Sequence, residues 1–90
     1  MKKAIVTVVG KDTVGIIHGV TGTLAENKIN VLDISQTILD EMFTMMMVVD
    51  ISASDMGIDG IAAILNETGK KIGVEIRIQL TDIFEAMHRI

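Results

Sequence analysis

The residues best suited to chemistry lie in one glycine-bounded segment near the start of the chain. It reads Gly10-Lys11-Asp12-Thr13-Val14-Gly15-Ile16 and leads into a predicted helix. The first amide groups of a helix have no partner within it, and a flanking glycine lets an anion approach them closely. A small carboxylate would fit there. Asp12 either accepts hydrogen bonds from a ligand ammonium group or caps the helix, and the two roles are compatible.

Other kinds of chemistry find less support in the sequence. The chain has no Cys, which excludes disulfides, thiolate metal sites and iron–sulfur ligation. His18 has no nucleophile or carboxylate at a motif spacing, so we expect a packing or surface residue. The methionines of residues 42–47 could ligate a soft metal or form an adaptable surface, but filling the core is the favoured interpretation. We therefore expect no enzyme, no metal site and no cofactor.

Length and composition indicate one small domain, residues 1–90, with more apolar surface than it can bury alone. Of its 90 residues 49% are hydrophobic, and the net charge is −4. A domain of this size buries only about 60–65% of its unfolded surface, so we expect a homo-oligomer, most simply a homodimer. The scattered Lys and Arg residues form no basic stripe for nucleic acid. The longest apolar runs, such as Met45 to Val49, are far below the ~18 residues of a membrane span. A soluble, cytoplasmic protein is expected.

The hydrophobic period changes several times along the chain and divides it into elements. Residues 4–9 read as a buried strand, and apolar positions at helical spacing from Val14 predict a helix that ends near residue 28. Alternation predicts a strand over residues 30–38, and an apolar strand over 42–51 follows a tight turn. Ser54 or Asp55 is available to cap a second helix over 58–72, and a last alternating strand covers 74–80.

The order β-α-β-β-α-β predicts an α+β, ferredoxin-like antiparallel sheet with both helices on one face. The first and third strands are apolar throughout and should be central, whereas the second and fourth alternate and should be edges. The other face, carrying either Ala4, Val6 and Val8 or Ile5, Thr7 and Val9, is left to be covered. We expect a core of residues 3–80 and a short helical extension over 81–90.

Two further patterns call for a contact partner. Gly15, Gly19 and Gly22 share one helical face, and because an internal Gly costs about 1 kcal/mol, close packing on the sheet or the approach of a partner helix is expected there. In the extension, Asp82 and Glu85 resemble a capping box ahead of an apolar stripe. Nine residues are too few for a stable isolated helix. We therefore expect this segment to dock either on its own subunit or on the opposite subunit.

The combined pattern resembles an ACT domain, a small regulatory βαββαβ module that binds amino acids. It consists of Gly10-x-Asp12-x-x-Gly15-Ile16-Ile17, then Leu24-Ala25 and Asn30-Val31-x-Asp33-Ile34, and it spans essentially residues 3–80. The hairpin and the C-terminal end further resemble small stand-alone ACT proteins of uncharacterised role, some of them likened to the glycine-cleavage regulators. The family places its ligand between the first loop of one subunit and the second strand of its neighbour. The resemblance therefore implies a ligand-binding set of Gly10, Lys11, Asp12, Gly15 and Ile16 with Asn30, Val31 and Leu32.

Two functions from different classes follow. The first is a regulatory protein that binds an amino acid or similar small carboxylate at a homodimer interface. The second is a ligand-free dimerisation module that docks onto a metabolic enzyme or regulator, because this chain has Thr13-Val14 where family members often have Arg-Pro. Asn30 correspondingly either contributes to the ligand site or only shapes the turn into its strand. An RNA-recognition module would need aromatic residues on the central strands, and only Phe43 is present there.

Overall fold

The computed structural model describes residues 2–11 and 14–81, which form six elements in the predicted order. These are β1 (Lys3–Lys11), α1 (Ile16–Glu26), β2 (Asn30–Leu39), β3 (Met42–Asp50), α2 (Ile58–Ile72) and β4 (Val74–Leu80). Residues 82–90, where the sequence predicts a helical extension, lie outside the described residues.

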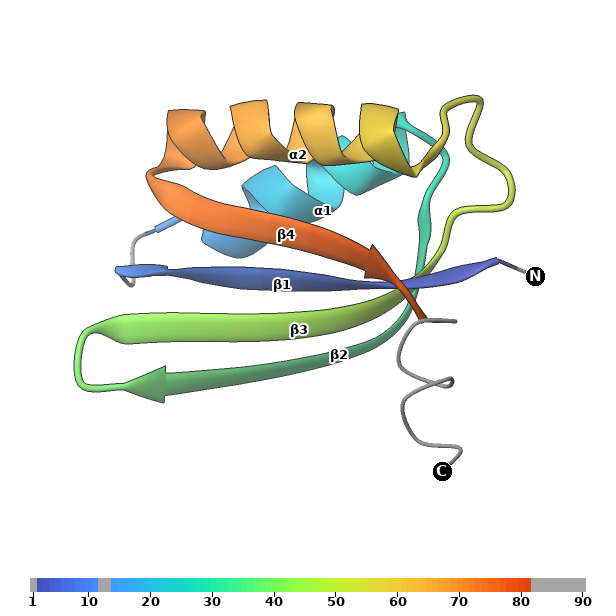
Figure 1. Cartoon of the computed structure of the whole chain (residues 1–90). Helices are drawn as coiled ribbons and strands as arrows, with labels where there is room; N and C mark the ends of the chain where they lie inside the picture. The colour runs from blue at the N-terminus through green and yellow to red at the C-terminus, as the bar shows by residue number, and fades with distance from the viewer. Residues whose placement is uncertain (1, 12–13, 82–90) are drawn as a thin grey trace.

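All three strand pairs are antiparallel, and the sheet order is β2-β3-β1-β4. The two continuously apolar strands, β1 and β3, therefore occupy the centre, as their sequences predict. Both helices cover the same face of the sheet (Figure 1). The βαββαβ, ferredoxin-like prediction is confirmed.

The hydrophobic core is a single layer between the helices and one face of the sheet. In β1 the buried residues are Ala4, Val6 and Val8, so Ile5, Thr7 and Val9 point to the other face, which no described element covers. We call this second surface the outer face. The methionines divide in the same way, with Met45 and Met47 fully buried and Met46 on the outer face. The core consists of Ala4, Val6, Val8, Ile16, Val20, Leu24, Ile29, Phe43, Met45, Met47, Val49, Ile51, Ile61, Leu65 and Ile76.

Edge strand β2 departs from the half-buried pattern that its alternation predicts. Only Val31 is half-buried, and the side chains from Leu32 to Leu39 are exposed on both faces, because the helical layer does not extend over this part of the edge. Ile34 and Ile38 face the helix side yet are 45% and 53% exposed. A β-bulge between Val31 and Asp33 leaves Leu32 without a partner residue on β3.

The helix starts also differ from the sequence prediction. Helix α1 begins at Ile16 rather than Val14 because Gly15 adopts a left-handed conformation with φ 90°. Helix α2 is capped by Gly57 and not by Ser54 or Asp55. The Ser54 hydroxyl instead accepts a hydrogen bond from the Met56 amide at 3.3 Å, so it shapes the loop before the helix.

The glycines of α1 have different neighbours. Gly19 lies against the Ile72 side chain of α2, so the close packing predicted at this face is between the two helices rather than on the sheet. Space beside Gly22 is open. Across the same helix pair, the hydroxyl groups of Thr23 and Thr68 are 2.9 Å apart and hydrogen-bonded.

Two helical glycines should respond oppositely to substitution by alanine. A Cβ at Gly69 would lie 2.5 Å from the backbone oxygen of Val74, which cannot move without displacing β4, whereas a Cβ at Gly22 meets nothing within 4 Å. We expect Gly69→Ala to destabilise the protein by about 1–3 kcal/mol. Gly22→Ala should stabilise it by up to about 1 kcal/mol through helix propensity. Urea unfolding of both variants measures this; equal effects would contradict the packing of α2 on β4.

Candidate ligand-binding site

The first half of the predicted site lies where β1 ends and α1 begins. Gly10 is in the sheet, and a Cβ on it would stand 2.7 Å from Cγ1 of Val74, so the close approach of β1 and β4 requires glycine there. Lys11 is exposed at the end of the strand. Asp12 lies outside the described residues.

The start of α1 keeps its amide groups accessible. Gly15 takes the N-cap position in a conformation that favours glycine, and no described side chain caps the helix or places an acidic group in its first turn. The first amides of the helix therefore have no intrahelical acceptor and can receive an anion. Ile16, in contrast, is 2% exposed and belongs to the core, so it fixes the helix start rather than offering a side chain.

The second half lies at the start of β2. Asn30 is opposite Asp50 on β3, and Asp50 is opposite Lys3 on β1, so these three residues lie side by side on the outer face. Val31 points toward the helices, and Leu32 is the bulge residue, 40% exposed. The segment is accessible because β2 is an edge strand.

Within one chain the two halves are at opposite ends of the sheet. Gly10 is opposite Phe43, whereas Asn30 is opposite Asp50 at the far end of β3. At roughly 3.3 Å per strand residue these positions are about 23 Å apart. A free amino acid cannot bridge that distance, so a single chain does not bring the predicted residues together.

Asp50 is a polar residue of this region that the site prediction missed. The hydroxyl and the amide of Ser52 both donate hydrogen bonds to its carboxylate, the amide at 3.0 Å, and they hold the pKa of Asp50 below its usual range. Beside Asn30 this carboxylate remains ionised at neutral pH. Its signal in the sequence is that Asp50 and Thr44 are the two polar residues of the third strand.

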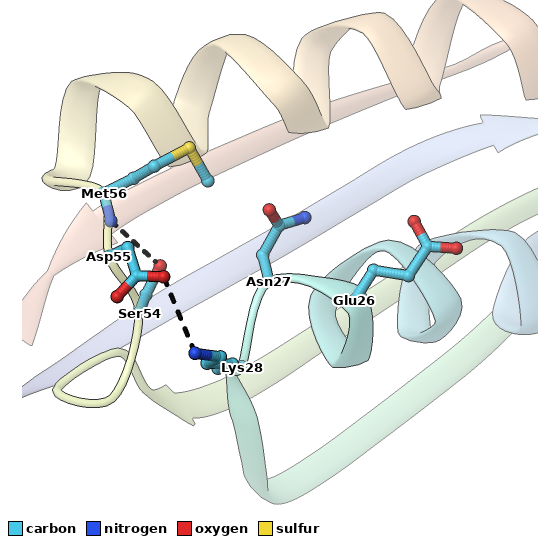
Figure 2. A pocket seen from close by; sticks show the side chains of 6 residues that line it. All are labelled: Glu26, Asn27, Lys28, Ser54, Asp55 and Met56. Carbon is cyan, nitrogen blue, oxygen red and sulfur yellow. Dashed lines mark hydrogen bonds and ion pairs between the residues drawn. The ribbon is translucent and has the colours of Figure 1, made fainter.

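A separate concavity of about 200 Å³ lies at the C-terminal end of α1 and is shown in Figure 2. The Lys28 ammonium and the Asp55 carboxylate form an ion pair across it at 3.6 Å, and both side chains are largely exposed, so the pair adds little stability. None of the predicted ligand-binding residues lines this concavity. Its lining is Glu26, Asn27, Lys28, Ser54, Asp55 and Met56.

The other polar side chains of the described residues do not gather into a second site. Among residues 2–11 and 14–81, no three His, Asp or Glu side chains gather as a metal site would require. His18 is exposed on α1. In the same part of the chain, neither helix has the length and apolar character needed to cross a membrane.

Comparisons with known proteins agree with this fold and these motifs. The family model described as ACT domain matches residues 2–79. A UPF0237 protein of Clostridium acetobutylicum is 57% identical over 88 residues, covering 98% of this chain and 99% of that protein. The solved ACT domain protein from Streptococcus pneumoniae is 48% identical, and the match covers 97% of this chain and 98% of that protein. The two structures superpose with a TM-score of 0.84.

The chain therefore belongs to the ACT domain family and, within it, to the group of small proteins designated UPF0237. The predicted resemblance is confirmed. A putative glycine cleavage system transcriptional repressor shares the fold, with a TM-score of 0.78 at 22% identity over 89% of this chain and 46% of that chain.

The lowered pKa of Asp50 predicts a pH-dependent contribution to stability. A carboxyl whose pKa is depressed in the folded state stabilises the fold above its unfolded pKa of about 3.9, and that contribution is lost as the pH falls through the folded value. The melting-temperature difference between wild type and Asp50→Asn should therefore be largest above about pH 5 and shrink below about pH 4. Thermal unfolding across this range measures it. Asp59→Asn is the control, and a pH-independent difference for Asp50→Asn would refute the assignment.

Proposed function

We propose that this protein is a cytoplasmic, non-enzymatic regulatory ACT protein that binds an amino acid or a similar small carboxylate between two copies of the chain. The observation that carries the proposal is the distance between the two half-sites within one chain. A second copy can place its own half-site next to the complementary half-site of the first. The ligand carboxylate would bind the open amides at the start of α1 with Lys11 nearby, and Asp12 would accept hydrogen bonds from the ammonium group.

The exposed edge of β2 supports a specific arrangement of the two copies. Its ten residues contain no Pro, and Val31, Ile34 and Ile38 place apolar side chains beside Gln36 on the helix side. An exposed edge of this kind favours pairing with another strand. Antiparallel pairing of β2 with itself about a two-fold axis is self-complementary. It would place Asn30 of one copy beside Leu39 of the other, and the four-stranded sheets would join into one.

This arrangement would bring the half-sites together. Leu39 is opposite Met42, which is opposite Lys11, so the end of β2 lies at the same end of the sheet as the first loop. Helix α1 contacts β2 while α2 contacts β4. The start of α1 is therefore on the side of the sheet where the two copies would meet. The segment Asn30-Val31-Leu32 of one copy would then face the α1 start of the other. Because Asn30 lies on the outer face, its side chain must turn over the edge of the strand to reach a ligand.

A ligand-free role has its own support. Val14 replaces the proline common in family members, and its side chain is fully exposed beside the predicted anion site. Thr13 stands where family members often have Arg, so this site lacks the guanidinium group that could hold a carboxylate, and the exposed Val14 side chain favours contact with a protein surface. In this alternative the dimer docks onto a metabolic enzyme or regulator and no amino acid stabilises it.

A thermal screen against the twenty amino acids separates the two roles. One amino acid at about 100 times its Kd should add about 2.7 kcal/mol and raise the Tm by at least several degrees. Asp12→Ala and Asn30→Ala should each abolish this shift. Asp59→Ala, on the exposed start of α2, is the matched control and should retain it. No shift with any amino acid would contradict the ligand-binding proposal and leave the docking role.

The β2 edge is tested independently by adding charge to it. Ile34 and Ile38 are exposed in one chain, so Ile34→Lys with Ile38→Lys should leave the fold intact. Two such strands facing one another would bring like charges together, and the dimer should dissociate at concentrations where wild type remains dimeric. Sedimentation velocity measures this. Ala63→Lys with Asn66→Lys on the exposed side of α2 is the control, and a dimer in both variants would place the interface elsewhere.

A further inference from the structure

The outer face of the sheet is an apolar centre with a polar rim. Ile5, Val9 and Val48 are half-buried on the two central strands, and Met46 beside them is 50% exposed. The flanking outer-face residues of the edge strands are polar, with Glu75, Arg77 and Gln79 on β4 and Asp33, Ser35 and Thr37 on β2. Thr7 and Thr44 lie among the apolar side chains of the two central strands. A largely apolar patch with a polar border is typical of a contact surface.

The face is also hollowed beside its centre. Thr7, Val9, Glu75 and Arg77 line a concavity of about 220 Å³. Its β4 side carries the Arg77–Glu75 ion pair, in which Nη2 and Oε1 are 2.7 Å apart. The hollow is bordered by Thr7 and Val9 toward the sheet centre and by charged side chains toward the edge. The Val9 side suits an apolar side chain arriving from the centre.

The chain itself continues from the border of this face. Strand β4 ends at Leu80, opposite Ala4. The next residue, Thr81, has left the strand, and its hydroxyl donates a hydrogen bond to the Lys3 carbonyl oxygen at 3.3 Å. This hydrogen bond holds the point where the chain leaves the sheet beside the start of β1, next to Ile5.

The sequence that follows has the pattern of a helix with one apolar side. Ile83, Phe84, Met87 and Ile90 recur at helical spacing, while Glu85 and Arg89 fall on the opposite side. A nine-residue helix is about 13 Å long, which matches the four residue steps from Ile5 to Val9 along β1. Thr81, directly after β4, already has helical backbone, so the change from strand to helix falls at the border of the outer face.

We infer that residues 82–90 form a helix that packs on the outer face of their own chain, with the apolar stripe over Ile5, Val48 and the hollow beside Val9. An attached segment that begins at the border of the face reaches it without the association cost that a second copy would meet. The sheet then has a helical layer on both faces. This inference concerns a different surface from the β2 edge and does not depend on ligand binding.

Methyl NMR of the full chain tests the inference directly. Nuclear Overhauser contacts should link the Met87 methyl group with methyl groups of Ile5 and Val48. In a mixture of labelled and unlabelled chains, an isotope-filtered experiment should show none of these contacts, because they arise within one chain. Contacts seen only between chains, or no contacts together with random-coil shifts for residues 82–90, would overturn it.

A pair of double variants gives an energetic test. Phe84→Ser with Met87→Ser removes the docking side chains, and Glu85→Ser with Arg89→Ser alters the opposite side of the same predicted helix. The first pair should lower the Tm by several degrees more than the second. Equal Tm values would overturn the inference, and a change in sedimentation confined to the first pair would assign the stripe to contact with a second copy instead.

Discussion

The contact between the helical layer and the helix-facing side chains of β1 and β3 determines the rest of the molecule. Ala4, Val6 and Val8 pack there with Met45, Met47 and Val49, all fully buried. The sheet has a single layer of core, so the edge positions and the outer face stay accessible. The surfaces at which ligand and partner contacts are proposed are those that this core leaves uncovered.

The central strands and the helix pair could be predicted because their signals are local. Continuous apolar runs placed β1 and β3 at the centre, and regular spacing of apolar residues marked both helices. The start of α1 was predicted two residues early because the left-handed turn at Gly15 depends on the path of the preceding loop. The cap of α2 was missed because Ser54 bonds within its own loop instead.

Residue types predicted the parts of the candidate site, whereas its division between two subunits was implied only by the family resemblance. Gly10 and Gly15 each have a conformational or packing requirement that only glycine meets, and both stood out in the sequence. Asn30 was identified, but its neighbour Asp50 was not, because their pairing across β2 and β3 is a long-range contact. The separation of the half-sites by the length of the sheet likewise follows from topology, which residue types alone do not reveal.

The bulge at Leu32 makes the length of the segment that enters β2 adjustable. Val31 lies on the helix side and Asp33 on the outer face, so the inside-outside order of the strand is the one it would have if Leu32 were absent. One residue can therefore be removed here without turning Asp33 toward the core or reversing Ile34 and Ile38. Insertions and deletions elsewhere in a strand invert every later side chain. At this position the sheet tolerates a change of length, so the contour of the proposed binding segment can vary while the scaffold stays the same.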